Sequence, residues 1–148
     1  MMCSYRRKST IVREQHTHYQ RPKLRTKITT AADVYSHLSE YQNLEREHFV
    51  AVILDGASRV INTRVISIGT LNQALVHPRE VFRPAIKDNA AGIIVAHNHP
   101  SGQLNPSIED RRITKRLKEV GKLIGIELLD HVILTEYSYY SFNEKGSM

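Results

Sequence analysis

The part of the chain that decides its fold is the stretch His97-Asn98-His99-Pro100-Ser101-Gly102-Gln103-Leu104-Asn105-Pro106-Ser107-Ile108-Glu109-Asp110. It follows a short apolar run at residues 90–96, which predicts a buried strand. A loop rich in proline, glycine and asparagine comes next. A helix is predicted to begin near Ser107. We therefore expect a strand, a loop and a helix in that order, with polar side chains at both joints.

Three side chains in this stretch form a plausible ligand set for a metal ion. Because residues i and i+2 of a strand point the same way, His97 and His99 can face one ion while Asn98 points elsewhere. Asp110 lies in the first turn of the predicted helix. Two imidazoles and a carboxylate suit an open, catalytic zinc site with a fourth position for water. Zinc lowers the pKa of such a water to roughly 7, so hydroxide is available at neutral pH.

Simpler interpretations exist for the same residues. Two histidines one residue apart are commonly just polar loop residues. The segment from Ser107 to Asp110 is close to a helix capping box, with a serine at the cap and an acid three residues later. The combination of both histidines with Pro-Ser-Gly and a nearby cap is harder to explain by folding stability alone. Ser107 can also begin the helix while its hydroxyl faces a metal site.

A candidate general base lies upstream. Glu47 precedes the apolar run 49–54, which predicts a strand bounded by an Asp55-Gly56 turn. A carboxylate at the mouth of such a strand can lie beside a metal-bound water, and only geometry can establish this. The alternative is a solvated charge at the start of a strand.

Taken together, these residues resemble the JAMM motif of the JAB/MPN+ metalloproteases. The pattern is Glu47, then His97-x-His99, seven further residues, and Ser107-x-x-Asp110. The surrounding sequence, from about residue 30 to 146, resembles the bacterial RadC-like branch of that family. The matching segments are Gly69-Thr70-Leu71, residues 77–82, residues 89–91, residues 97–102 and Asp130-His131.

The resemblance implies a fold, a cofactor and a role for each motif residue. The implied fold is an α/β, JAB/MPN-like (cytidine-deaminase-like) domain, with a curved, mostly antiparallel sheet flanked by helices and a single zinc site. His97, His99 and Asp110 would be the zinc ligands, Glu47 the general base, and Ser107 the group that helps hold the oxyanion. The implied activity is that of a zinc-dependent hydrolase, a metallopeptidase or isopeptidase that attacks a peptide or protein substrate with a zinc-activated water.

One feature departs from the RadC-like pattern. RadC-like proteins often carry a helix-hairpin-helix region ahead of this domain, and only about 28 residues precede it here. The resemblance therefore implies a short, stand-alone form, as is common among mobile-element and prophage genes. A DNA association through the helix-hairpin-helix region cannot be carried over.

The first 28 residues differ in charge from the rest. The length of 148 residues suits one domain, so we expect a basic, disordered tail at 1–28 and the JAB/MPN domain at 29–148. The tail has one acidic residue, Glu14, and eight basic ones: Arg6, Arg7, Lys8, Arg13, Arg21, Lys23, Arg25 and Lys27. Its net charge of +7 exceeds the +6 of the whole chain.

This charge supports a second functional hypothesis. A DNA repair or recombination accessory protein of a mobile element could hold DNA through residues 1–28, although such tails are also often only solvated leaders. A third hypothesis is a domain whose intact site serves mainly to bind a partner. The sequence leaves the oligomeric state open.

Nothing in the sequence indicates a membrane or secreted protein. It has no apolar run of 18 or more residues and no secretory signal, so we expect a cytoplasmic protein without a membrane partner. Its single cysteine, Cys3, cannot form an internal disulfide.

The remaining segments predict a scaffold. Thr30 is expected to cap a helix, residues 58–68 to form one or two strands, and Pro78 to begin a helix that reaches about Asn89 with a kink at Pro84. The helix from Ser107 is expected to end near Gly121 or Gly125. The strand 126–134 is expected to be interrupted at Asp130-His131, and His131 is either a partner of a metal ligand or an ordinary core histidine.

Overall fold

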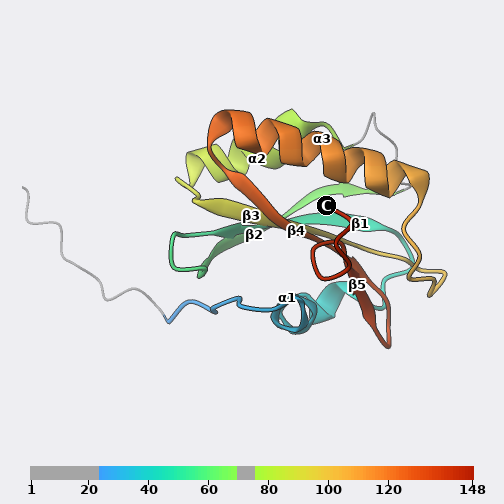
Figure 1. Ribbon diagram of the computed structural model, residues 1–148. Coiled ribbons are helices and arrows are strands. Elements are labelled where there is room, and N and C mark those ends of the chain that lie inside the picture. The colour runs from blue at the N-terminus through green and yellow to red at the C-terminus, as the bar shows by residue number, and fades with distance from the viewer. Residues whose placement is uncertain (1–23, 70–75) are drawn as a thin grey trace, which may run out of the picture.

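The fold is a five-stranded mixed sheet with helices on both faces, seen in a computed structural model that describes residues 24–69 and 76–148 (Figure 1). The elements in chain order are α1 (Ala31–His37), a 3-10 turn (Ser39–Tyr41), β1 (His48–Leu54), β2 (Val60–Ile68), α2 (Pro78–Lys87), β3 (Gly92–Asn98), α3 (Ile108–Ile124), β4 (Glu127–Leu134) and β5 (Tyr139–Ser141).

The sheet has the strand order β2-β1-β3-β4-β5. All neighbouring pairs are antiparallel except β3 and β4, which run parallel. Parallel neighbours need a crossover connection, and α3 supplies it between these two strands. The expected α/β fold with a mostly antiparallel sheet is therefore confirmed, and the strand-loop-helix stretch of residues 92–124 lies at its centre.

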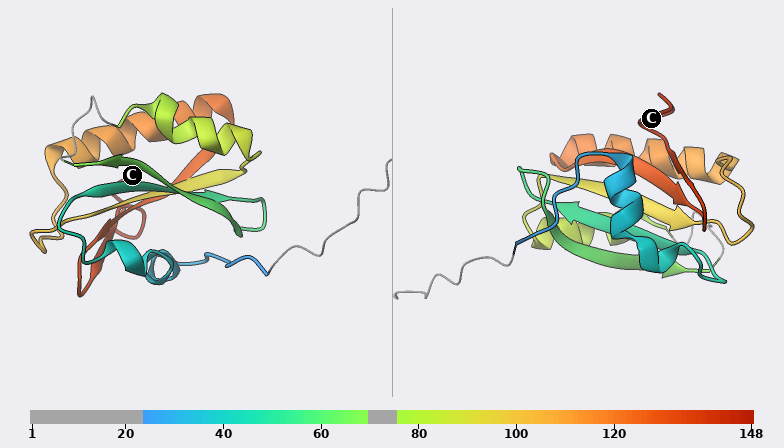
Figure 2. Two further views of the ribbon diagram at one scale, coloured as in Figure 1. Left: turned by 180° about the vertical axis from the view of Figure 1, so that it is seen from behind. Right: turned by 90° about the horizontal axis from the view of Figure 1, so that it is seen from below.

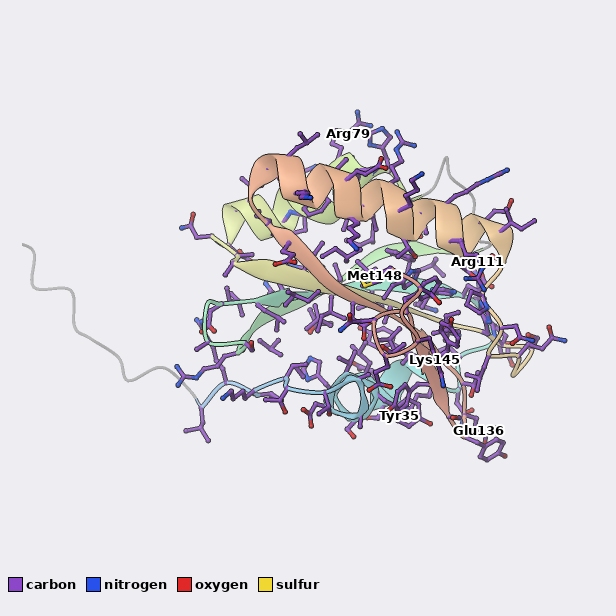
Figure 3. The ribbon with its side chains drawn as sticks, viewed as in Figure 1. Tyr35, Arg79, Arg111, Glu136, Lys145 and Met148 are labelled. Atoms are coloured by element: carbon purple, nitrogen blue, oxygen red, sulfur yellow. The ribbon has the colours of Figure 1, made fainter. Side chains whose placement is uncertain are left out.

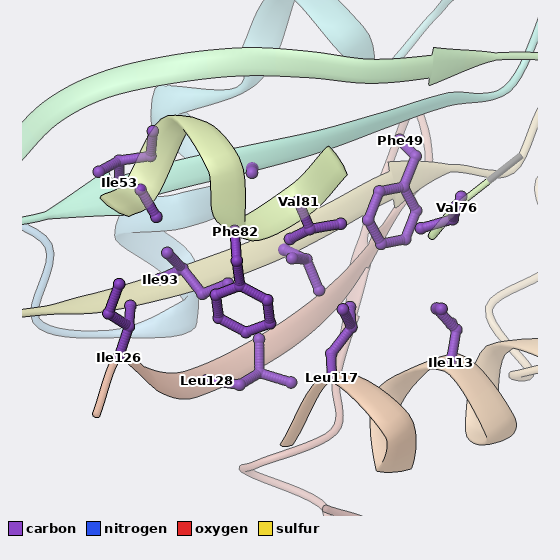
Figure 4. Packing of buried hydrophobic residues seen from close by; sticks show 13 residues of the cluster. Phe49, Ile53, Val76, Val81, Phe82, Ile93, Ile113, Leu117, Ile126 and Leu128 are labelled. Atoms are coloured by element: carbon purple, nitrogen blue, oxygen red, sulfur yellow. The ribbon is translucent and has the colours of Figure 1, made fainter. Parts of the chain in front are cut away.

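Two cores form because the strands alternate their side chains between the two faces of the sheet. Helices α2 and α3 cover one face, which we call the α2–α3 side, and α1 covers the other, the α1 side (Figure 2). On the α2–α3 side, Phe82, Leu117 and Leu128 pack together between helices and sheet (Figure 4). The last residue, Met148, packs against the same cluster (Figure 3).

Helix α3 is held close to the sheet at its C-terminal end. It ends at Gly125, whose φ of 75° is a left-handed cap that glycine adopts without strain. A Cβ on Gly121 would lie 2.5 Å from the carbonyl oxygen of Ile126, so only glycine allows this approach to the chain entering β4. The later of the two expected helix ends is therefore the correct one.

The scaffold differs from the expectation mainly in β4 and β5. Strand β4 runs through Asp130 and His131 without interruption, and its irregularity is a bulge one residue earlier. In that bulge Ile93 pairs with Leu128 and Ile94 with Asp130, so Leu129 is the extra residue. Residues 60–68 form one strand, which is one of the two alternatives expected. Helix α2 begins at Pro78 as expected, continues through Pro84 and ends at Lys87, two residues before Asn89. Strand β5 was not expected from the sequence.

Residues just ahead of the expected boundary at residue 28 already contact the sheet. The carbonyl of Thr26 accepts a 2.8 Å hydrogen bond from Val60, and Ile28 is buried and donates to Ser58 at 2.9 Å. Most of the tail, residues 1–23, lies outside the described residues, as do residues 70–75, which include part of the Gly69-Thr70-Leu71 segment. Within 24–69 and 76–148, no helix is both long enough and apolar enough to cross a bilayer.

Candidate metal centre

The site lies where the end of β3 meets the first turn of α3. The alternation along β3 places His97 on the α2–α3 side, the same side as Ile93 and Val95. Both His97 and Asp110 are almost wholly buried, and His97 Nε2 lies 3.2 Å from Asp110 Oδ1. His99 follows the strand and is anchored by its backbone N–H, which donates to the carbonyl of Leu134 at 2.9 Å.

The three predicted ligands come together as expected. One ligand atom from each of His97, His99 and Asp110 lies within 4.8 Å of the others. The two Nε2 atoms are 2.9 Å apart, and His99 Nε2 is 3.6 Å from Asp110 Oδ2. The structure therefore groups two imidazole nitrogens and a carboxylate, a set of donors that suits zinc and other borderline transition metals.

Hydrogen bonds on the outer side of the rings indicate which nitrogen faces the site. His99 Nδ1 lies 2.6 Å from the carbonyl oxygen of Gln103, which can only accept. Nδ1 must therefore carry the proton, and in the neutral ring Nε2 is left with a lone pair. Nδ1 of His97 is likewise engaged, 2.9 Å from His131 Nε2.

The site is negative at one end. Burial opposes ionisation of Asp110, but the facing imidazoles of His97 and His99, which donate to the carboxylate whenever their Nε2 atoms carry protons, outweigh this and hold its pKa far below the ordinary value. Burial alone would lower the pKa of His99, whereas Asp110 and the Gln103 carbonyl raise it above the ordinary value. Protons therefore favour His99 over Asp110, and a cation is attracted between them.

Ser107 caps the helix that carries Asp110. It is the N-cap of α3, where its Oγ accepts a 3.0 Å hydrogen bond from the N–H of Asp110. In return Asp110 Oδ2 accepts from the N–H of Ser107 at 2.7 Å. The capping box predicted as the simpler interpretation is real, and the same box carries the candidate ligand.

Glu47 lies beside the site. It immediately precedes β1, and its charge is near enough to His99 to help raise the pKa of that imidazole. The carbonyl of Glu47 accepts a 2.9 Å bond from the N–H of Gly69, which fixes the backbone there. The structure therefore places its charge near His99.

Asn98 has contacts that its sequence context did not predict, and it lies between the two histidines and points to the opposite face. Its Oδ1 accepts from the N–H of His48 at 2.7 Å. Its Nδ2 donates to the carbonyls of Leu44 and Arg46 at 3.1 and 3.0 Å. Asn98 therefore ties the segment that carries Glu47 to the strand that carries the ligands. The alternation of the strand already indicated its direction, but not its partners.

Two further buried groups support the histidines from behind. His131 of β4 contacts His97, and Thr114 of α3 lies 2.6 Å from His131 Nδ1. Complete burial, and the positive charge that His97 carries whenever it is protonated, hold the pKa of His131 well below its ordinary value. His131 is thus both a core residue and a partner of a candidate ligand.

A cleft of about 540 Å³ opens beside the site. His99 lines it, together with residues from 42–45, 100–104 and 135–138. At one rim the Tyr35 hydroxyl donates to the carbonyl of Glu136 at 3.0 Å, which joins α1 to the 135–138 turn. The cleft leaves His99 accessible from the surface.

Comparison with known proteins identifies the family. The family model of the RadC-like JAB domain matches residues 28–147. The chain belongs to this family. A "UPF0758 protein" of Rubrobacter xylanophilus is 52% identical over 122 residues, covering 82% of this chain and 53% of that protein. "UPF0758 proteins" of Chlorobium chlorochromatii and Thermotoga maritima are 48% and 44% identical, covering 87% and 88% of this chain.

The chain spans somewhat more than half the length of these relatives, 53%, 58% and 59% respectively. The family match agrees with the resemblance drawn from the motif. A RadC-like JAB domain with a clustered His97, His99 and Asp110 is compatible with a metal-dependent hydrolase.

Proposed function

We propose that this chain is a zinc-dependent hydrolase that cleaves amide bonds, acting as a metallopeptidase or isopeptidase on a peptide or protein. The observation that carries the proposal is the convergence of His97, His99 and Asp110 within 4.8 Å. The Gln103 carbonyl directs the lone pair of His99 into the cluster, opposite an ionised carboxylate. Such a pocket of acceptors is completed by a cation.

Each motif residue has a task in this proposal. His97, His99 and Asp110 would hold the ion, which when bound lowers the pKa of water and polarises a carbonyl. Glu47 removes the proton from the attacking water and returns it to the leaving amine. The Ser107 hydroxyl accepts from Asp110 but keeps its own proton, which it donates to the oxygen that becomes negative.

The metal assignment is tested by zinc content. We expect one zinc per chain in the purified protein and none in His97→Ala. His37→Ala is the matched control, because His37 is a half-buried histidine in α1 that pairs with Thr63 away from the site. Equal zinc in all three proteins would contradict the ligand assignment.

The base assignment is tested by Glu47→Gln, with Glu40→Gln in the exposed 3-10 turn as the control. Glu47→Gln should keep its zinc and lose roughly 10²–10⁴-fold in cleavage of a peptide library. Glu40→Gln should retain both properties. Loss of zinc from Glu47→Gln would show instead that Glu47 is a ligand.

The second candidate function is DNA association in repair or recombination, and the net charge of the tail favours it. Arg79 and Arg111 add positive charge on the helical layer (Figure 3).

The DNA hypothesis is tested by deleting the basic tail. Since Thr26 and Ile28 contact the domain, the deletion should remove residues 1–23 only. If the tail is the contact, this deletion weakens DNA binding and reduces its salt dependence, while zinc content and hydrolysis persist.

A further inference from the structure

The hydroxyl of Thr114 is shared between two partners and has one proton to donate. Its Oγ1 lies 2.6 Å from the backbone carbonyl of Asp110 and 2.6 Å from His131 Nδ1. The carbonyl can only accept, so the hydroxyl proton of Thr114 is committed to it. His131 Nδ1 must therefore be the donor in the second bond and carry a proton.

The tautomer of His131 determines the tautomer of His97. His131 has no exposed surface and lies against the rings of Phe49 and Phe142, an environment that favours the neutral imidazole. A neutral ring protonated at Nδ1 has a lone pair on Nε2. His131 Nε2 therefore accepts from His97 Nδ1 across 2.9 Å. His97 in turn keeps its lone pair on Nε2, the atom that faces Asp110.

The bulge in β4 makes this arrangement possible. Leu128 faces the α2–α3 side, and regular alternation would direct Asp130, not His131, to the same side. Because Leu129 is an extra residue, His131 takes that direction and pairs in register with Val95 of β3. The bulge thus aims the imidazole at both Thr114 and His97.

We propose that Thr114 and His131 are positioning residues that hold His97 in the tautomer with an unprotonated Nε2 and thereby raise its affinity for zinc. The chain of bonds begins at the backbone of one candidate ligand, Asp110, and ends at the ring of another, His97. Formation of the helix that presents Asp110 is thereby linked to the state of His97. The inference rests on the metal site of the proposed function.

The first test reads the tautomer directly. Long-range ¹H–¹⁵N NMR spectra of the imidazoles in the full chain without zinc, at pH 7.5, distinguish a protonated Nδ1 from a protonated Nε2. We expect the wild-type spectrum to show the proton of His97 on Nδ1. In Thr114→Val the spectrum should show a mixture of the two tautomers, and Thr114→Ser should restore the wild-type pattern. A wild-type His97 with its proton on Nε2 would overturn the inference without any variant.

The second test measures zinc affinity by competition with a chromophoric chelator. Loss of a group that orients a ligand costs about 10–100-fold in metal affinity, and we expect that loss in Thr114→Val and in His131→Leu. Thr114→Ser keeps the hydroxyl and should bind zinc within a few-fold of wild type. Thr63→Val is the matched control, because Thr63 makes a 2.9 Å bond to His37 on the other side of the sheet. It loses the same kind of bond and should keep wild-type affinity.

The possible outcomes separate this inference from the proposed function. Wild-type zinc affinity and an unchanged tautomer in Thr114→Val would overturn the positioning role and leave the metal site intact. A wild-type chain that binds no zinc would overturn the proposed function. Should Thr114→Val fail to fold, two measurements still test the positioning role. A wild-type spectrum with the His97 proton on Nε2 would contradict it, and so would a Thr114→Ser variant that loses the wild-type tautomer. If Thr63→Val weakened zinc binding as much as Thr114→Val does, the loss would reflect general destabilisation, and this result would also overturn the proposal.

Discussion

Two helices of this domain begin with the same local motif and use it differently. At the start of α1, Thr30 and Asp33 form a capping box, and at the start of α3, Ser107 and Asp110 form another. In each, the hydroxyl accepts from the backbone of the acid and the acid accepts from the backbone of the cap. Judged by local sequence, the two helix starts are equivalent.

The residue before the cap makes the first difference. Thr29 precedes the α1 cap and donates to Asp33 from its backbone at 2.8 Å and from its hydroxyl at 2.7 Å. Pro106 precedes the α3 cap and has no N–H to donate. Asp33 therefore receives three local donors and remains at the surface, whereas the carboxylate of Asp110 is left with capacity for His97 and His99.

Burial makes the second difference. Asp110 is 1% exposed and lies above the end of β3, so its negative charge acts in a site with little water. The same chemical group is thus a helix cap in one place and a candidate metal ligand in the other. The comparison shows that a capping box does not exclude a functional site, and it offers matched pairs of variants.

The largest expected effect is that of Asp110→Asn compared with Asp33→Asn. Both remove the charge from a capping box, but only Asp110 faces two imidazoles. Loss of a residue that only orients a metal ligand can cost roughly 100-fold in zinc affinity. We expect Asp110→Asn to lose more than this, since a ligand itself is removed. Asp33→Asn should bind zinc normally. Chelator competition measures both, and equal affinities would show that Asp110 is not a ligand.

The second pair is Ser107→Ala and Thr30→Ala. Each loses a side-chain cap, which costs about 1 kcal/mol of the free energy of unfolding. Only Ser107→Ala should also lose cleavage of a peptide substrate, by roughly 10²–10³-fold if its hydroxyl stabilises the oxyanion. Urea unfolding and a cleavage assay separate the two effects. If both variants keep full activity, Ser107 is a cap only.

A third variant makes the α3 box resemble that of α1. Pro106→Thr adds an N–H and a hydroxyl where Thr29 supplies both to Asp33. One new hydrogen bond to Asp110 is worth about 1 kcal/mol, so we expect zinc affinity to fall by roughly five-fold. A crystal structure of the variant should show the new bond. Unchanged affinity with the bond present would show that local donors do not compete with the metal.

The smallest expected effect concerns acid. Hydrogen bonds from the side chain and backbone of Thr29 and from the backbone of Thr30 lower the pKa of Asp33 from 3.8 to about 2. A lowered folded-state pKa stabilises the protein above the unfolded value, and this stabilisation is lost as pH falls from about 4 to about 2. The difference in unfolding free energy between wild type and Asp33→Asn should be constant from pH 7 to 5 and shrink below 4. If this free-energy difference at pH 2.5 equalled that at pH 7, the lowered pKa of Asp33 would be contradicted.

Much of the site was predictable because its parts are local. Alternation along a strand places His97 and His99 on one side, and the cap places Asp110 one turn into α3. The motif also led to the family, which the match over residues 28–147 confirms. The supporting residues were not predictable in the same way. Asn98 finds its partners 50 residues or more away in the sequence, and Thr114 meets His131 across the gap between helix and sheet.

By itself the sequence determined the local structure: the apolar strands, the helix starts at Thr30 and Ser107, and a stop of α3 at either Gly121 or Gly125. Those features depend on hydrogen bonds and steric limits within a few residues. Only the tertiary structure decided that β4 bulges at Leu129 and aims His131 inward. A bulge is set by how two strands pair and by what a helix packs above them, so its energy lies in contacts between residues far apart in the chain.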